Sequence, residues 1–324
     1  MKVLVTGGAG YAGSIVSRLL LAQGHRVRVL DSLLYGGRGL LGLYHQEDFH
    51  FLRGDIRERA SVEEALKGME AVVHLAALVG DPACSRRPEL AREINLEGSL
   101  RLFEAARRSG IKRFIYASTC SNYGKMRDPS QYLTEDSELR PVSLYAQTKV
   151  SVEERLLASS GNGGGPAVTV LRFATLYGLS PRMRFDLTVN EFTMELMTRR
   201  KVTVYGEQFW RPYLHLRDAA RAVLLVLTTP AEKVAGQAFN VGDTGQNFQK
   251  GRLVEMISSQ VGGRVQIERV AQVDDPRDYR VSFEKAAAVL GFRITRTVEG
   301  GIQEIMEAIS QGVITDFDNS VYRN

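Results

Sequence analysis

The amino-terminal stretch constrains the fold more than any other part of the sequence. Residues 2–6 read KVLVT, a short apolar run typical of a buried β-strand, and the glycine-rich segment GGAGYAG follows directly. Residues 14–24 then carry apolar side chains at helical spacing. Strand, glycine turn and helix occur in the order that a dinucleotide-binding unit requires.

Each glycine of this turn has a different expected role. Gly7 permits the tight turn, Gly10 lets the backbone approach a pyrophosphate, and Gly13 lets the helix pack closely on its strand. The free N–H groups at the start of the helix favour phosphate. We therefore predict that the cofactor contacts Gly7, Gly10, Tyr11, Ala12 and Gly13.

The second apolar run, residues 25–30, ends in Asp31. A carboxylate at this strand end can accept hydrogen bonds from both hydroxyls of an adenosine ribose, and it would repel a 2′-phosphate. The sequence therefore favours NAD over NADP.

Strands and helices alternate through the next part of the chain. Apolar strand patterns occur at residues 49–52, 71–75, 113–118 and 167–173, and amphipathic helices are expected at 61–67 and 89–109. This alternation predicts an α/β fold with a doubly wound parallel sheet of the Rossmann type. Ligands of such sheets bind at the carboxyl ends of the strands, so we expect further cofactor contacts from Asp55, Ile56, Leu75, Ala76 and Ala77.

The pattern changes after the strand that ends at Phe173. We predict an NAD-binding domain over residues 1–175 with a return segment at about 212–242. Residues 176–211 and 243–324 are then expected to form a smaller α/β substrate domain.

Composition excludes several other classes of protein. With 324 residues, 44% hydrophobic and 24% charged, the chain has the composition of a globular protein. The net charge of +5 is scattered, which favours small phosphorylated ligands over nucleic acid. No apolar run reaches the ~20 residues of a membrane span. Two cysteines without metal-ligand spacing, and a start without a signal-peptide pattern, predict a cytoplasmic protein with no metal site.

Tyr145 and Lys149 are the leading catalytic candidates. Their spacing of four places both side chains on one face of a helix. A neighbouring ammonium favours the phenolate, so we expect the pKa of Tyr145 to fall below the usual value of about 10. Tyr145 would then act as a proton acceptor.

Together these motifs resemble the extended short-chain dehydrogenase/reductase family, and within it the nucleotide-sugar epimerases and dehydratases. GGAGYAG resembles the cofactor loop of that family, HLAA its strand-end motif, and RFATLYG the segment that closes the cofactor domain. Asn95 matches its helix asparagine. Thr119, Tyr145 and Lys149 match its catalytic residues.

The resemblance implies an NAD cofactor, a nucleotide-diphosphate sugar substrate and a homodimer packed through helices at 89–109 and 145–157. It implies that Arg211 and Arg277 bind the diphosphate and that Arg184 and Asn190 cover the sugar or nucleotide. Ser118, Ser121 and Asn122 are the remaining expected substrate contacts. We expect Arg182 and Arg200 to be surface charges and His215 to be structural, because it lies in the apolar run YLHL.

The reaction that follows sugar oxidation stays open. The dehydratases that the chain resembles carry an Asp-Glu pair where this sequence has Cys120 and Ser121, so dehydration is disfavoured. A 4-epimerase needs no further acid or base. Alternatively, Cys120 exchanges a proton on carbon in a 3- or 5-epimerase, with Cys84 and Asp81 beside it, or the chain is a 4-ketoreductase. Packing alone would also explain a cysteine at position 120.

Overall fold

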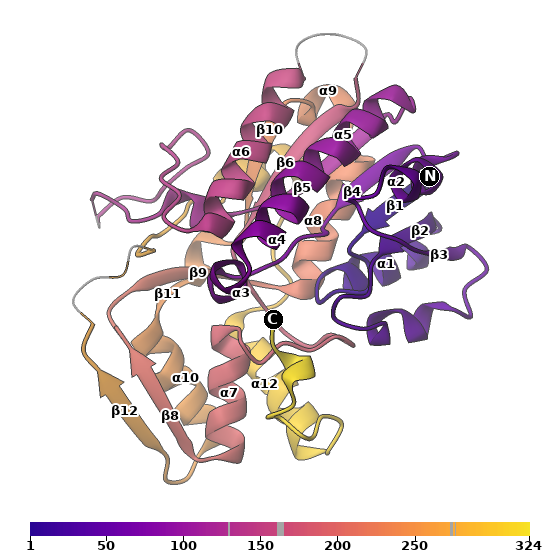
Figure 1. Ribbon diagram of the computed structural model, residues 1–324. Coiled ribbons are helices and arrows are strands. Elements are labelled where there is room, and N and C mark those ends of the chain that lie inside the picture. The colour runs from indigo at the N-terminus through magenta and orange to yellow at the C-terminus, as the bar shows by residue number, and fades with distance from the viewer. Residues whose placement is uncertain (129, 161–164, 273–274, 276) are drawn as a thin grey trace.

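A seven-stranded parallel sheet organises the larger part of the molecule (Figure 1). The structure is a computed structural model that describes residues 1–128, 130–160, 165–272, 275 and 277–324. The glycine-rich sequence GNGGGP at 161–166, which predicts a loop, lies largely outside the described residues. The strand order is β10-β6-β5-β4-β1-β2-β3, and every neighbouring pair is parallel. The strands are β1 (Lys2–Thr6), β2 (Arg26–Asp31), β3 (Phe49–Arg53), β4 (Ala71–His74), β5 (Arg113–Thr119), β6 (Ala167–Phe173) and β10 (Gln237–Val241). The predicted Rossmann-type fold is confirmed.

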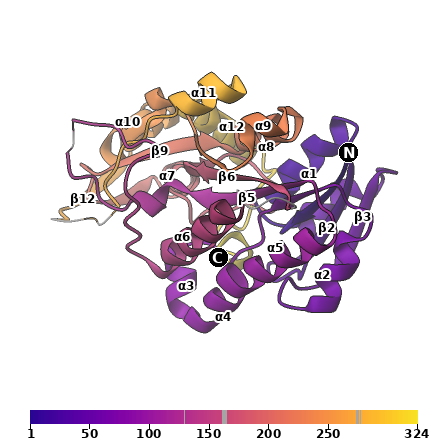
Figure 2. The ribbon, with the colours of Figure 1, turned by 90° about the horizontal axis from the view of Figure 1, so that it is seen from above.

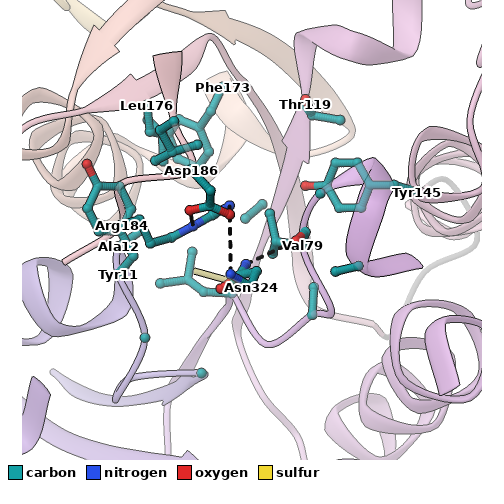
Figure 3. A pocket seen from close by; sticks show the side chains of 18 of the residues that line it. Tyr11, Ala12, Val79, Thr119, Tyr145, Phe173, Leu176, Arg184, Asp186 and Asn324 are labelled. Atoms are coloured by element: carbon teal, nitrogen blue, oxygen red, sulfur yellow. Dashed lines mark hydrogen bonds and ion pairs between the residues drawn. The ribbon is translucent and has the colours of Figure 1, made fainter. Parts of the chain in front are cut away.

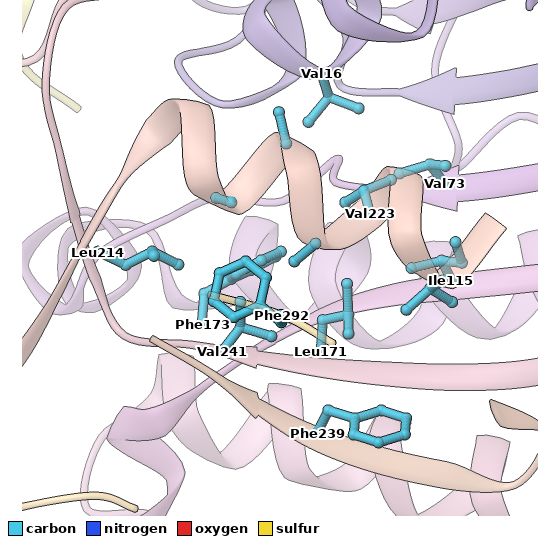
Figure 4. Close-up of a cluster of buried hydrophobic side chains, with 14 of the residues drawn as sticks. Val16, Val73, Ile115, Leu171, Phe173, Leu214, Val223, Phe239, Val241 and Phe292 are labelled. Atoms are coloured by element: carbon cyan, nitrogen blue, oxygen red, sulfur yellow. The ribbon is translucent and has the colours of Figure 1, made fainter. Parts of the chain in front are cut away.

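Helices cover both faces of this sheet (Figure 2). Alternate residues of β1 point to opposite faces, so Val3 and Val5 belong to one buried cluster and Leu4 to another. The first cluster packs against α1 (Gly13–Ala22) and α8 (Leu216–Thr228) (Figure 4). The second packs against α2 (Arg59–Leu66), α5 (Ser99–Arg108) and α6 (Leu144–Ser159). Strands buried on both faces explain the unbroken apolar runs in the sequence.

A second, smaller region holds two short sheets and three longer helices. β7 (Thr175–Tyr177), β9 (Trp210–His215) and β11 (Asn247–Gln249) form one sheet, and β8 (Lys201–Tyr205) pairs with β12 (Gln266–Val270) in the other. α7 (Thr188–Thr198), α10 (Lys250–Val261) and α12 (Val298–Ser310) pack together around a separate apolar cluster. α8 and β10 lie on the large sheet, whereas β9 pairs with β7 and β11 in the smaller region and contributes Leu214 to the core of the large sheet.

The single helix expected at 89–109 is interrupted. The chain runs through α4 (Pro88–Arg92), a π-helical segment (Glu93–Gly98) and then α5. π-helical turns inside α-helices are rare and often occur at functional sites. Asn95 lies in this widened turn.

The described part of the chain has neither a membrane-spanning helix nor a cluster of metal-ligating side chains. None of its helices combines the length and the apolar character that a membrane crossing requires. None of its histidine, cysteine, aspartate and glutamate side chains gather in groups of three or more that could hold a metal ion.

Candidate functional site

A cavity of about 770 Å³ lies at the carboxyl edge of the large sheet and extends to the smaller region. This edge, next to the point between β1 and β4 where the strand order reverses, is where open parallel sheets bind ligands. The cavity brings together most of the residues singled out in the sequence: Gly7, Gly10, Tyr11, Ala12, Gly13, Asp31, Asp55, Ile56, Leu75, Ala76, Ala77, Ser118, Thr119, Ser121, Tyr145, Lys149, Arg184, Arg211 and Arg277.

The glycine turn has the geometry that a dinucleotide needs. Gly7 has φ +75°, in the left-handed region that favours glycine, and a Cβ there would lie 2.7 Å from the backbone nitrogen of Ala76. A Cβ on Gly13 would lie 2.1 Å from the Gly7 carbonyl oxygen. No side chain caps the start of α1, which lines the cavity. Its N–H groups and dipole therefore suit a pyrophosphate.

Asp31 and Asp55 stand at the ends of neighbouring strands. Asp31 accepts hydrogen bonds from the backbone N–H groups of Ala9 and Leu33, at 3.0 and 2.8 Å, which fixes its carboxylate at the cavity wall. Burial raises the pKa of Asp31. Burial would also raise the pKa of Asp55, but hydrogen bonds from Arg57 outweigh it and hold that pKa below its ordinary value. The two carboxylates fit the ribose and the adenine end of NAD respectively.

The catalytic candidates face one another at the centre of the cavity. α6 begins after Ser143, whose hydroxyl caps the helix by accepting from the Ala146 N–H at 3.2 Å. This start places Tyr145 on the first turn, with its hydroxyl directed into the cavity near Thr119 (Figure 3). One turn later, the Lys149 ammonium donates to the Ala117 carbonyl oxygen at 2.8 Å.

The acid–base properties of this pair differ from the prediction. Burial raises the pKa of Tyr145, and the neighbouring Cys84 thiol adds to the rise. Lys149 lies 6.0 Å from the centroid of the Tyr145 ring, and burial lowers its own pKa to about 7. The predicted fall in the Tyr145 pKa is therefore wrong for these side chains by themselves, because desolvation outweighs a cation at this distance.

The depressed pKa of Lys149 predicts a pH-dependent stability. Between pH 7 and the unfolded pKa of about 10.5, the unfolded chain binds more protons than the folded protein, so the free energy of unfolding should rise with pH. We expect a rise of about 1.4 kcal/mol per pH unit above about pH 7, until the thiols of the unfolded chain ionise near about pH 8.5. Urea unfolding of cofactor-free protein measures it.

Lys149→Met should remove this rise, and it should stabilise the protein most at and below about pH 7. Lys112, which is exposed, provides the matched control, and Lys112→Met should keep the wild-type pH dependence. Parallel pH profiles for wild type and Lys149→Met would contradict the prediction.

A cluster of cations marks the other end of the cavity. The Arg211 guanidinium pairs with Asp275 at 2.7 Å, and the Lys250 ammonium lies 3.4 Å from the same carboxylate. Burial opposes ionisation of Asp275, but Arg211 holds its pKa below the ordinary value. Arg277 pairs with Asp81 at 2.7 Å. The arrangement offers several donors to an anion with several oxygens, as a diphosphate has.

Both the sequence and the fold of the chain are similar to those of known proteins. Residues 3–242 match the NAD dependent epimerase/dehydratase family. The chain belongs to this family.

Individual relatives divide between two reactions. The UDP-glucose 4-epimerase of Corynebacterium glutamicum is 30% identical over 90% of this chain and 90% of its own length. The dTDP-glucose 4,6-dehydratase of Streptomyces niveus is 31% identical over 95% and 92%. The solved structure of Thermus thermophilus UDP-glucose 4-epimerase in complex with NAD superposes with a TM-score of 0.84, at 28% identity over 97% of this chain and 100% of that one. Family membership confirms the predicted resemblance and the prediction of NAD as cofactor.

Three predicted contact residues do not line the cavity of this family member. Each is a fully buried asparagine whose amide bonds to another part of the chain. Asn95 accepts from the Leu78 N–H and donates to the Leu78 carbonyl, at 2.7 and 2.9 Å, which fixes the loop after β4. Asn190 accepts from the Gly178 N–H and donates to the Tyr11 hydroxyl. Asn122 donates to Ser118. Their predicted direct contacts with ligands are corrected to positioning roles.

Cys120 also lies outside the cavity. Its side chain is 1% exposed, and the thiol donates to the Arg172 carbonyl oxygen at 3.1 Å. Burial raises its pKa well above the ordinary range. The interpretation of Cys120 as an acid or base is therefore corrected to packing. Cys84 is likewise buried away from the cavity, whereas Asp81 lines it.

Several functional candidates escaped sequence reasoning. Arg182 was expected at the surface, but it is 4% exposed, lines the cavity and stacks on the Tyr35 ring at 4.6 Å. Lys250 was missed because a lysine at the start of a helix has no distinctive pattern. Arg200 is exposed as expected. His215 is fully buried 3.3 Å from Glu304 and does not line the cavity, which agrees with a structural role.

Proposed function

We propose that this protein is an NAD-dependent nucleotide-sugar 4-epimerase. The observation that supports it best is the pairing of Tyr145 and Thr119 in the cavity with Ser121 and a buried Cys120. Neither Cys120 nor Ser121 is a carboxylic acid, so these two positions do not supply the proton donor that water elimination needs. Epimerisation at carbon 4 needs no such group.

The residues divide the work as follows. Bound NAD supplies a reversible hydride acceptor. Tyr145 accepts the proton of the sugar hydroxyl and later returns it, which requires the positive charge of bound NAD to offset the burial that raises the Tyr145 pKa. Thr119 donates a hydrogen bond to the oxygen that becomes a ketone. Three cations hold the diphosphate while the keto-sugar rotates between its oxidation and its reduction: Arg211, Lys250 and Arg277.

Solvent isotope incorporation tests the proposal. The protein would be incubated with UDP-, dTDP-, GDP- and CDP-sugars in deuterated water, and the products analysed by NMR and mass spectrometry. We expect one sugar to give its 4-epimer without deuterium on carbon, because the same hydride returns. Deuterium on carbon 3 or 5 would indicate proton exchange, and a 4-keto-6-deoxy product would indicate a dehydratase like the Streptomyces niveus relative.

Cys120→Ala separates the alternatives among epimerases. Because the thiol is buried against the Arg172 carbonyl, we expect kcat/KM to stay within about threefold of wild type. A loss of about 10²-fold or more would return Cys120 to the mechanism as a proton carrier. The proposal also includes a homodimer located in the cytoplasm. Sedimentation equilibrium tests the assembly state.

A further inference from the structure

The last residues of the sequence reach the cavity. After α12 the chain turns back, and residues 317–324, which we call the strap, run along the loop after β7. Phe317 and Tyr322 pack edge-on against Phe185, with ring centroids 5.7 and 5.4 Å apart. The Phe185 N–H donates to the Tyr322 carbonyl at 2.9 Å. The strap is thus anchored by a buried aromatic cluster as well as by its backbone.

Beyond this anchor, Asn324 bridges two walls of the cavity (Figure 3). Its side-chain amide donates to the Val79 carbonyl at 3.0 Å, on the loop after β4. Its backbone N–H donates to Asp186 at 3.3 Å, on the loop after β7. Arg182 donates to its side-chain oxygen at 2.7 Å, and Arg86 to its backbone oxygen at 2.8 Å.

These contacts join the loop after β4, next to the expected cofactor contacts Ala76 and Ala77, to the loop after β7, which carries Arg184. The Asn324 side chain is held from both sides, because its nitrogen bonds to Val79 and its oxygen to Arg182, so this wall of the cavity is fixed by the protein itself. A fixed wall suits a cavity in which a sugar must turn before the hydride returns.

We propose that the strap closes the cavity between the loop after β4 and the loop after β7 and so retains the keto-sugar during turnover. The inference rests on the proposed epimerase function. With NAD bound, the hydride that leaves the sugar would pass to the nicotinamide and the proton to Tyr145. If the keto-sugar escapes before the reverse step, the two electrons stay on the cofactor and the enzyme stops in its reduced form. The strap lowers the frequency of this escape.

The experiment uses NAD-loaded enzyme with Asn324→Ala, Tyr322→Ala and a deletion of residues 317–324. Reduced nicotinamide is followed by absorbance during turnover, and release of UDP or dTDP by stopped-flow. Loss of one hydrogen bond or one packed ring should raise two quantities by about tenfold. They are the fraction of turnovers in which the keto-sugar escapes and the rate of nucleotide release. We expect kcat for the initial burst to be unchanged, because Tyr145 is untouched.

Two controls separate closure from general damage. Tyr322→Phe keeps the ring against Phe185 and should behave as wild type. Asp318→Asn alters only an exposed pair between the strap and Arg199, and it should also behave as wild type.

The outcomes distinguish the two proposals. If the wild type epimerises and the strap variants retain keto-sugar and nucleotide equally well, the strap inference is wrong. If the wild type does not epimerise, the epimerase proposal fails, and unchanged nucleotide release would then refute closure independently.

Discussion

Tyr145→Phe should lower kcat by about 10²–10⁴-fold, which is the usual contribution of a positioned acid or base. The substitution removes only the hydroxyl that is directed into the cavity beside Thr119 (Figure 3). The ring remains half-buried at the start of α6, so the helix, its Ser143 cap and the NAD site should persist. We expect NAD affinity to change by less than about threefold.

The measurement pairs steady-state epimerisation with calorimetric titration of NAD. Tyr116→Phe is the matched control, because Tyr116 is fully buried beneath Lys149, 4.7 Å from its ammonium, and does not line the cavity. We expect the kcat of Tyr116→Phe to stay within a few-fold of the wild-type value. Full activity in Tyr145→Phe would remove the phenol from the mechanism, and equal losses in both variants would indicate damage to the fold.

Gly13→Ala should destabilise the protein and weaken cofactor binding together. The added methyl group would lie 2.1 Å from the Gly7 carbonyl oxygen and 2.7 Å from Gly8 Cα, and these backbone atoms can move only with the turn. Overpacking of this kind costs about 1–3 kcal/mol. Because the start of α1 must shift away from the phosphates, we also expect the Kd for NAD to rise at least about tenfold.

Urea unfolding and NAD titration measure the two effects. Gly300→Ala is the control, since Gly300 lies in α12 with only the Thr297 hydroxyl 3.7 Å from an added Cβ. Alanine there should stabilise the protein by about 0.5–1 kcal/mol, because glycine loses more backbone entropy on folding. The prediction is wrong if Gly13→Ala matches wild type in both measurements.

Local backbone requirements explain why much of the fold was predictable. The φ of Gly7 and the close approach at Gly13 depend on residues nearby in the sequence, so the GGAGYAG pattern signals them directly. The apolar run before Asp31 signals its position at a strand end. The unbroken apolar runs identify strands buried on both faces. Tyr145 and Lys149 could be paired because helical spacing by itself places them on one face.

Tertiary contacts explain what could not be predicted. An arginine in the sequence carries no sign of whether it will be solvated or stacked, so Arg182 was assigned to the surface although it is buried on Tyr35. The amides of Asn95 and Asn190 bind backbone groups of other segments, and only the folded chain identifies those partners. The direction of the Tyr145 pKa depends on desolvation, which spacing along a helix does not report.

The π-helical turn at Glu93–Gly98 lets Leu102 pack on the sheet while Asn95 bonds to Leu78. A regular helix would fix the orientation of these two side chains relative to each other. Removing one residue there should let α4 continue into α5 as an ordinary helix, with Leu102 still against the sheet. Asn95 would rotate away from Leu78, and the loop after β4 would lose the two hydrogen bonds that fix it. A one-residue deletion could therefore leave a well-folded protein that no longer retains its coenzyme.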